Sequence, residues 1–182
     1  MDSPFMSQVA HGVAKPKVRV VRFEFPYMKL RRKDARNRPP DREPVLLAAW
    51  RAVISELGDA SRLVIGGKSL GGRIASMVAD EMGVRGLVCL GYPFHPPGKP
   101  EYPRIAHLQR LRTPALILQG TRDPFGRREE VVEYRLSKKI RFGWIEDGDH
   151  SFKPRASSGR TEAQNLEEAI LMVGDFMDEL FR

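Results

Sequence analysis

Short apolar runs alternate with longer amphipathic segments along the chain. Five runs have the length and β-branched content of strands, and they occupy residues 18–25, 62–66, 86–91, 115–120 and 140–145. The middle three are apolar throughout, which is typical of strands that helices cover on both faces of a parallel sheet. The last run alternates instead, with Ile140, Phe142 and Trp144 on one face. We therefore expect residues 140–145 to form an edge strand.

Three segments carry apolar side chains at helical spacing. The first covers residues 46–57 and ends at Gly58, which can close a helix in the left-handed conformation. The second covers residues 74–82. In the third, Thr161 and Gln164 form a capping box ahead of a long apolar stripe. Strands that alternate with helices predict an α/β fold with a mainly parallel sheet flanked by helices.

Length and composition indicate one folded domain that spans residues 1–182. Hydrophobic residues make up 41% and charged residues 30%, which suits a globular protein rather than a disordered one. No run of about 18 apolar residues predicts a membrane span, and the N-terminus has no signal-peptide pattern. Cys89 is the only cysteine, so an intramolecular disulfide is excluded. We expect a cytoplasmic protein without a membrane partner.

The chain is strongly basic, with a formal net charge of +8. Much of the excess lies in residues 29–42, KLRRKDARNRPPDR, for which we expect a solvated loop. Basic proteins often bind nucleic acids. This segment, however, lacks the interleaved aromatic residues that stack on single strands. No nucleic-acid partner is therefore expected.

The stretch LVIGGKSLGG, residues 63–72, fits two motifs. A phosphate-binding P-loop would need a glycine at position 62, where the chain has Arg62, and a loop where residues 63–65 predict a strand. The second motif is Gly-x-Ser-x-Gly, with Gly67 and Gly71 on either side of Ser69. A strand before it and a helix after it predict a nucleophile elbow that exposes the serine hydroxyl. We therefore take Ser69 as the candidate nucleophile.

A serine nucleophile needs a base, and the base needs an acid that orients it. Asp123 follows the strand at 115–120, and His150 follows the strand at 140–145. The carboxyl ends of parallel strands lie on one edge of the sheet, where open α/β proteins place their sites. Ser69, Asp123 and His150 also occur in the chain order of such hydrolases. The sequence thus predicts a catalytic Ser69–His150–Asp123 group.

Each of these assignments has an alternative. Asp123 precedes a proline and could only begin a turn, and His150 could cap a loop. Asp147 or Asp149 could orient His150 instead, but residues so close in sequence seldom face each other well, and Asp123 is favoured.

Other residues are candidates for the surroundings of the site. Lys68 and Arg73 place positive charge near the rim and could favour an anionic substrate, although solvated surface charge is the alternative. Tyr92 and His95 belong to a Pro-rich loop that should overhang the site, so they are assigned with Lys68 to a possible substrate pocket. A rigid structural loop is the alternative for that segment.

The remaining histidines and the cysteine have simpler interpretations. His11 and His107 fall in predicted helices and are interpreted as surface or packing residues. Cys89 lies inside a strand and is interpreted as a small buried hydrophobe.

Four stretches, GGKSLGGRIAS, GYPFHPPGKPE, LILQGTRDPFG and DGDHSF, together carry a family resemblance. The chain resembles the small, lidless α/β-hydrolases related to dienelactone hydrolase. Within them it is similar to the bacterial group akin to the testis-expressed and chromatin-complex hydrolase-like proteins of animals. The resemblance covers nearly the whole chain and implies an α/β-hydrolase fold with Ser69 as nucleophile, His150 as base and Asp123 as its partner.

The N-terminus departs from that family. In such proteins a strand and a His-Gly-type loop precede the helix that begins here near Ser3 and Pro4. That loop normally supplies one of two oxyanion donors, and the backbone N–H of Leu70 would be the other. The strand would lie between 18–25 and 62–66 in the sheet. We therefore expect an N-terminally truncated hydrolase with a gap in its sheet. The alternative is a chain that has repaired this gap in an unusual way.

The sequence predicts a serine hydrolase that cleaves a small ester, thioester or related acyl compound through an acyl-enzyme on Ser69. Its partner would be a small acyl substrate, and no metal or organic cofactor is expected. The alternative is a non-catalytic α/β-hydrolase-like scaffold that binds a protein or a ligand.

Overall fold

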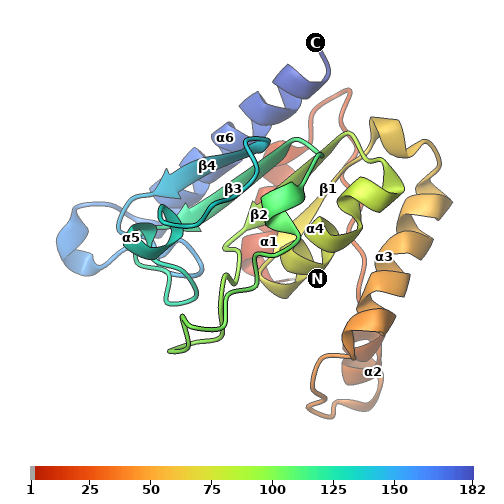
Figure 1. The fold of residues 1–182 in the computed structure, drawn as a ribbon, viewed down its shortest axis with the longest axis horizontal. Coiled ribbons are helices and arrows are strands. Elements are labelled where there is room, and N and C mark those ends of the chain that lie inside the picture. Colours follow the sequence, from red (N-terminus) through yellow and green to blue (C-terminus); the bar gives the residue numbers. More distant parts are fainter. Residues whose placement is uncertain (1–2) are drawn as a thin grey trace.

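A computed structural model describes residues 3–182, and its centre is a four-stranded parallel sheet in the order β1-β2-β3-β4 (Figure 1). The strands are β1 (Val64–Lys68), β2 (Gly86–Leu90), β3 (Ala115–Gly120) and β4 (Ile140–Ile145). Four of the five predicted strands are thus confirmed, although β1 begins and ends two residues later than predicted. All carboxyl ends lie on the same edge, because every neighbouring pair runs parallel.

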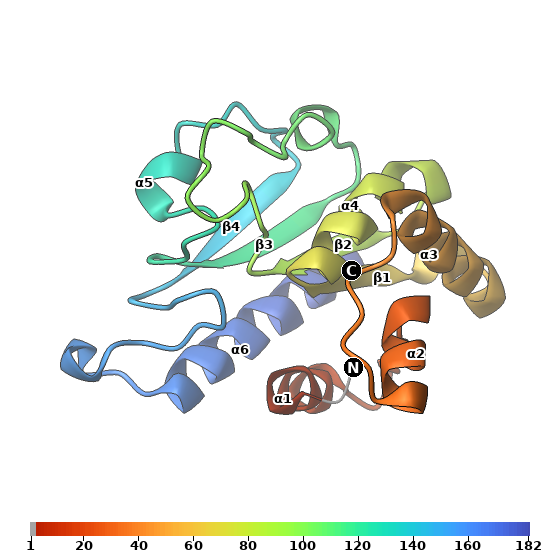
Figure 2. The same cartoon turned by 90° about the horizontal axis from the view of Figure 1, so that it is seen from below.

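Helices cover both faces of this sheet, as Figure 2 shows from below. On one face α4 (Leu70–Met82) packs on β1 and β2, and α3 (Glu43–Leu57) packs on α4. On the other face α6 (Glu162–Leu180) crosses the strands, with α1 (Pro4–Val13) beside it. Every residue of β2 and β3 is buried, which explains their continuous apolar sequence. The α/β-hydrolase fold with flanking helices is confirmed.

Local sequence signals set several helix ends as predicted. The Ser3 hydroxyl accepts a hydrogen bond of 3.3 Å from the Met6 N–H at the start of α1, where Pro4 is the first residue. Thr161 and Gln164 form the predicted capping box of α6, with hydrogen bonds of 2.8 and 3.2 Å. β4 is an edge of this sheet among residues 3–182. Its Ile140, Phe142 and Trp144 pack on one core cluster, as predicted.

The predicted strand at residues 18–25 is wrong. These residues are extended but do not join the sheet, and only Val18 forms an isolated bridge, with Lys15. Instead, Phe23 packs edge-to-face on Trp50 of α3, with ring centroids 4.7 Å apart, and on Phe25 at 5.5 Å. Aromatic packing therefore holds this segment against α3, and no strand formed by residues 3–182 pairs with the outer edge of β1.

Two further local predictions need correction. The basic segment at 29–42 is not all loop, because residues 26–34 form α2 (Pro26–Asp34), which begins at a proline. His107 is not in a helix but in a turn before the short 3-10 helix Leu108–Arg110. Its Nε2 lies 2.8 Å from the Ser76 hydroxyl, and burial lowers its pKa to about 4. It is therefore a neutral packing residue. His11 lies in α1, as predicted, and is exposed.

None of the helices formed by residues 3–182 combines the length and the apolar character that crossing a membrane demands.

Candidate active site

Ser69 occupies a sharp turn between β1 and α4. Its backbone angles are φ 51° and ψ −119°, a region that residues other than glycine rarely adopt. Such a conformation costs about 1–3 kcal/mol and persists where the surroundings hold it. Here the Ser69 N–H donates to the Leu90 carbonyl at 2.9 Å, and the Ser69 carbonyl accepts from the Arg73 N–H at 3.0 Å. The turn has the geometry of a nucleophile elbow.

Close packing around the turn requires glycine, but not at both positions that the motif names. A Cβ at Gly67 would lie 3.0 Å from the Gly71 carbonyl carbon. A Cβ at Gly71 would meet nothing within 4 Å. Gly72 is tighter than either, because a Cβ there would lie 2.5 Å from the Gly67 carbonyl oxygen. The backbone of α4 therefore approaches β1 most closely at Gly72, one residue beyond the motif.

The structure brings Ser69, His150 and Asp123 together. The Ser69 Oγ lies 2.9 Å from the His150 Nε2, and the His150 Nδ1 lies 2.8 Å from the Asp123 Oδ2. A carboxylate accepts the Nδ1 proton, so the Nε2 is left to accept from the serine hydroxyl. The three side chains come from separate connections, after β1, after β3 and after β4. Parallel strands thus deliver them to one edge, as their order in the sequence predicts.

Neither neighbouring aspartate takes the place of Asp123. Asp149 uses its Oδ1 to accept from the Ser151 and Lys153 N–H groups at 2.7 and 3.0 Å. The Asp147 carboxylate binds Arg155, with 2.8 Å between Oδ1 and the Arg155 Nε. Both aspartates shape the loop that carries His150, and only Asp123 contacts its ring.

Gln119 is a functional candidate that the sequence reasoning missed. It is fully buried, and its Nε2 donates to the Asp123 Oδ2 at 2.9 Å. The same amide binds both backbone groups of Tyr92: its Oε1 accepts from the N–H at 2.8 Å, and its Nε2 donates to the carbonyl at 3.2 Å. The Phe125 N–H donates to the other oxygen of Asp123 at 2.9 Å. The only signal in the sequence is one amide in an otherwise apolar strand.

Ser69 and His150 open into a cavity of about 510 Å³. Most of its wall is apolar or aromatic, and several lining residues come from the segment between α1 and α2 and from α2 itself: Val21, Phe23, Phe25, Tyr27 and Met28. Met6 of α1 and Trp50 of α3 complete the apolar lining. Lys68 and Arg22 also line the wall, which contains no carboxylate among residues 3–182. The cavity suits an apolar acyl group.

Lys68 lines this cavity, as expected of a pocket residue. Its Nζ donates to the His150 carbonyl at 2.8 Å and lies 5.1 Å from the centre of the Phe5 ring. Burial lowers the pKa of Lys68, and the charges of Asp123 and Asp149 partly oppose that shift. Lys68 thus links the loop of His150 to α1.

Comparison with known proteins places the chain in a family. A family model described as an alpha/beta hydrolase domain matches residues 1–178. The chain belongs to this alpha/beta hydrolase family. Its solved relatives agree with the fold described above.

Three alpha/beta hydrolase structures illustrate the similarity. An α/β serine hydrolase without a lid, from Xanthomonas campestris, superposes with a TM-score of 0.71 at 16% identity, over 98% of this chain and 74% of that one. An alpha-beta serine hydrolase homologue from Coxiella burnetii gives 0.70 at 19% identity, over 96% and 76%. An esterase domain from a Rhodothermus marinus protein gives 0.66 at 15% identity, over 96% and 79%. At identities this low, the superpositions establish the shared fold alone.

Tyr92 and His95 do not belong to the pocket of this hydrolase fold, which corrects the prediction. Tyr92 is fully buried, and its hydroxyl donates to the Arg104 carbonyl at 2.9 Å. His95 is also buried, with its Nε2 3.1 Å from a carboxylate oxygen of Glu130. The loop packs against α5 (Arg128–Val131) and against the loop after β3, where the His95 N–H donates to the Phe125 carbonyl at 3.3 Å, and its residues do not line the cavity of Ser69. The alternative of a rigid structural loop holds.

The other candidates have structural surroundings. Arg73 pairs with Glu43 at 2.7 Å, which joins α4 to α3. Cys89 is fully buried, and burial raises the pKa of its thiol, so it behaves as a small hydrophobe. Leu70 is the first residue of α4 and lines the cavity, and its N–H has no backbone acceptor within the helix.

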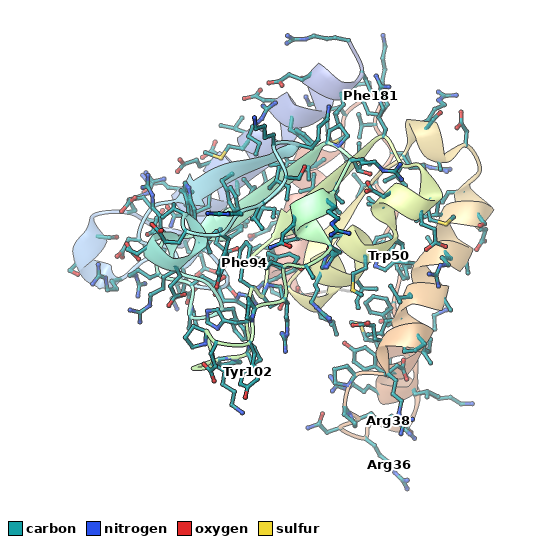
Figure 3. All side chains as sticks on the ribbon, viewed as in Figure 1. Arg36, Arg38, Trp50, Phe94, Tyr102 and Phe181 are labelled. Carbon is teal, nitrogen blue, oxygen red and sulfur yellow. The ribbon has the colours of Figure 1, made fainter. Side chains whose placement is uncertain are left out.

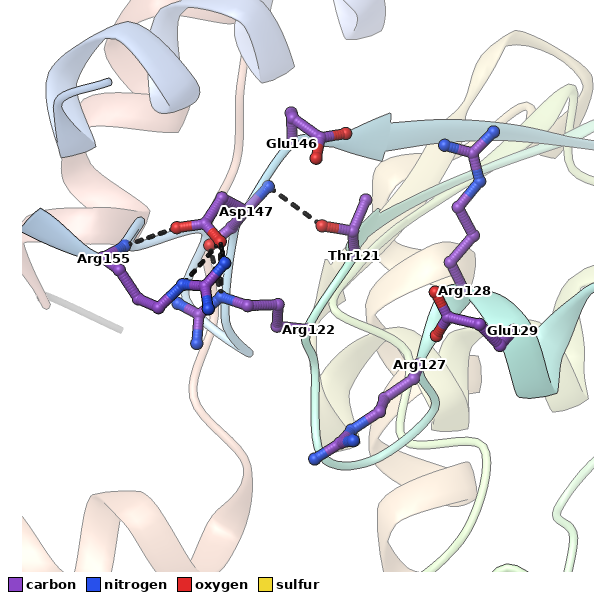
Figure 4. Close-up of a pocket in the computed structure, with 8 residues that line it drawn as sticks. All are labelled: Thr121, Arg122, Arg127, Arg128, Glu129, Glu146, Asp147 and Arg155. Atoms are coloured by element: carbon purple, nitrogen blue, oxygen red, sulfur yellow. Dashed lines mark hydrogen bonds and ion pairs between the residues drawn. The ribbon is translucent and has the colours of Figure 1, made fainter. Parts of the chain in front are cut away.

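A second cavity, of about 610 Å³, lies beyond the carboxyl ends of β3 and β4 (Figure 4). Its wall is polar and consists of Thr121, Arg122, Arg127, Arg128, Glu129, Glu146, Asp147 and Arg155. Asp147 binds both Arg122, at 3.0 Å, and Arg155. The carboxylates of this wall thus balance much of its positive charge. Across residues 3–182, no three His, Cys, Asp or Glu side chains are grouped to hold a metal ion.

Proposed function

We propose that this protein is a serine hydrolase that cleaves a small ester, thioester or related acyl compound. One observation carries the proposal: Ser69, His150 and Asp123 form a continuous hydrogen-bonded row at the wall of an apolar cavity. An activated serine, a base and an orienting acid are the groups that acyl transfer requires. The membership in the alpha/beta hydrolase family supports the same chemistry.

In the proposed mechanism, His150 accepts the proton of Ser69 as the serine oxygen attacks the acyl carbonyl carbon. The tetrahedral intermediate expels the alcohol or thiol, to which His150 returns the proton, and an acyl-enzyme remains on Ser69. His150 then takes a proton from water, which attacks the acyl carbonyl. The bond between the acyl carbon and the Ser69 oxygen breaks, the acid leaves, and His150 returns the proton to Ser69. Asp123 keeps the His150 ring in the tautomer that both steps need, and stabilises its positive charge.

The negative oxygen of the intermediate needs hydrogen-bond donors. We assign the Leu70 N–H to this role, because it opens α4 directly after the nucleophile and lines the cavity. The N-terminus of a helix also carries a partial positive charge. Each such donor contributes on the order of a hundredfold to a thousandfold in turnover.

We also propose that the chain belongs with the small, lidless hydrolases related to dienelactone hydrolase. The similarity to the lidless structure from Xanthomonas campestris supports this grouping. The substrates of the group are poorly defined, so the chemistry of the cavity is the better guide to substrates.

Steady-state hydrolysis tests the proposal. Purified protein is mixed with 4-nitrophenyl esters of increasing acyl length and with the matching thioesters. The matched variants are Ser69→Ala and Ser55→Ala, which removes an exposed hydroxyl from α3. We expect hydrolysis by the wild type and by Ser55→Ala, and its loss in Ser69→Ala. Equal rates in Ser69→Ala would refute the role of Ser69, and no hydrolysis by folded wild type would favour the binding scaffold.

A further inference from the structure

The two faces of α2 carry different side chains. On the inner face, Tyr27 and Met28 line the cavity of Ser69. On the outer face, Lys29, Leu30 and Lys33 are exposed, and Leu30 keeps 45% of its surface in solvent. A helix with its side chains is about 10 Å thick. Whatever contacts the outer face of α2 therefore lies next to the wall of the Ser69 cavity.

This helix and the loop after it carry a large uncompensated positive charge. Residues 29–42 contain seven Lys or Arg and two Asp. Arg32 pairs with Glu24 at 2.8 Å, and Arg38 pairs with Asp34. Within residues 3–182, no carboxylate forms an ion pair with the side chains of Lys29, Lys33, Arg36 or Arg42, which are all exposed. Figure 3 shows Arg36 and Arg38 at the tip of a projection that α2 and this loop form.

Exposed apolar side chains accompany these cations. Val20 and Val21, in the segment that leads to α2, are 38% and 48% exposed, and Val21 also lines the cavity. The aromatic side chains of the same segment, Phe23, Phe25 and Tyr27, are turned inward. We call Lys29, Leu30, Lys33, Arg36 and Arg42 the α2 surface.

The side chains of the α2 surface suit an anionic bilayer better than a single-stranded nucleic acid. A single-stranded nucleic acid would be bound by exposed aromatic rings beside the cations, and those rings are absent from this surface. An anionic bilayer attracts clustered Lys and Arg through its headgroups and accepts Val and Leu side chains at the headgroup boundary. The combination on the α2 surface is complementary to the bilayer.

We propose that the α2 surface docks this protein peripherally on a membrane that contains anionic lipid. The sequence-based expectation of no membrane partner rested on the lack of a spanning segment, which does not address peripheral binding. A consequence rests on the proposed function: docking places the cavity beside the bilayer, where an acyl ester of a single-chain amphiphile can reach Ser69.

Vesicle sedimentation tests the docking. The wild type is mixed with vesicles of phosphatidylcholine alone, or of phosphatidylcholine with phosphatidylglycerol, at rising NaCl concentration. We expect binding only to the anionic vesicles and a steep loss with salt. The double variant Lys29→Glu/Lys33→Glu should bind them more than about tenfold more weakly, and Leu30→Ser should bind several-fold more weakly.

The control is Lys138→Glu/Lys139→Glu, which makes the same change in charge at two exposed residues before β4. It should bind like the wild type. No binding to anionic vesicles, or equal losses in the two double variants, would overturn the proposal. Tighter binding to a single-stranded oligonucleotide than to the vesicles would replace the membrane with nucleic acid.

The docking can be judged separately from the chemistry. Ser69→Ala should bind anionic vesicles like the wild type, because no catalytic step is involved. Lys29→Glu/Lys33→Glu should hydrolyse a soluble short-chain ester at the wild-type rate and lose rate only on an ester embedded in anionic vesicles. If this double variant lost activity on the soluble ester but not on the embedded ester, the α2 surface and the active site would not be separate.

Discussion

Asp123 and His150 follow β3 and β4 at the carboxyl edge of the sheet, whereas much of the apolar wall of the cavity comes from a segment outside the sheet. The first region, which we call the polar wall, consists of His150, which lines the cavity, and of Asp123 and Gln119, which are buried behind it. Its Gln119 and Asp123 are fully buried, and hydrogen bonds of 2.8 to 2.9 Å join the three side chains. The second, the aromatic wall, consists of Val21, Phe23, Phe25, Tyr27 and Met28.

The aromatic wall is held differently. Its contacts are ring to ring, such as Phe23 on Trp50, and most of its members are only half buried. Directional hydrogen bonds fix the polar wall, while packing without directional bonds forms the aromatic wall. The comparison teaches that changes in the polar wall should act on turnover, and changes in the aromatic wall should act on substrate binding.

The largest effect is expected at Asp123. Both of its oxygens accept hydrogen bonds, one from the Phe125 N–H and the other from Gln119 and His150. In Asp123→Asn, an NH2 group replaces one of the two oxygens and faces a donor, so a hydrogen bond is lost. The charge that orients His150 is lost as well. We expect kcat to fall by about ten-thousandfold, measured with a short-chain ester.

Asp149→Asn is the matched control for Asp123→Asn. It alters a carboxylate next to His150 in sequence that does not contact the ring. Its kcat should stay within about tenfold of the wild type. A larger loss in Asp149→Asn than in Asp123→Asn would mean that the wrong acid has been assigned.

Gln119 should give the next effect. Gln119→Leu removes a donor to Asp123 and leaves the Tyr92 N–H without its acceptor. We expect kcat to fall by about tenfold to a hundredfold with little change in KM. Gln119→Glu keeps an acceptor for Tyr92 but places a second carboxyl group beside Asp123. Full kcat in Gln119→Glu would mean that Gln119 serves only Tyr92 and does not position Asp123.

The elbow below both walls supplies a prediction about stability. Gly72→Ala forces a Cβ to within 2.5 Å of the Gly67 carbonyl oxygen, so the helix must shift. We expect the free energy of unfolding to drop by about 2–3 kcal/mol, measured by denaturant unfolding. Gly71→Ala meets nothing within 4 Å and should leave that free energy unchanged or raise it slightly. Equal losses in the two variants would contradict the packing described.

The smallest effect should appear in the aromatic wall. Phe23→Ala enlarges the cavity and removes an edge-to-face contact with Trp50. We expect KM for short acyl esters to rise about threefold to tenfold, with kcat nearly constant and longer acyl groups preferred. Phe181→Ala, at an exposed ring 51% accessible near the C-terminus, is the control. A fall in kcat without a change in KM would erase the distinction between the walls.

Asp123, His150 and the elbow could be predicted from sequence because local signals determine them. Each apolar strand ends at a fixed edge, and Ser69, Asp123 and His150 follow three such strands. The aromatic wall could not be predicted in this way. Residues 18–25 have the composition of a strand, but side-chain contacts decide whether such a segment joins a sheet. Here Phe23 packs on Trp50 of α3, and the outer edge of β1 carries no strand from residues 3–182.

The path of a loop is equally hard to predict from sequence. Tyr92 and His95 follow a strand that ends at the site, yet their loop turns back because buried contacts with Arg104 and Glu130 hold it. Gln119 could have been recognised, since a buried amide in an apolar strand needs partners. Its partners, however, lie in two loops whose paths only the structure reveals.

The rate at which a fluorophosphonate labels Ser69, followed by intact mass, tests the central claim most directly. The probe reports the reactivity of the serine without requiring a known substrate. The account predicts one adduct in the wild type and in Asp149→Asn, much slower labelling in Asp123→Asn, and none in Ser69→Ala. Labelling of Ser69→Ala to the same extent, or an unreactive Ser69 in folded wild-type protein, would contradict an activated Ser69–His150–Asp123 row.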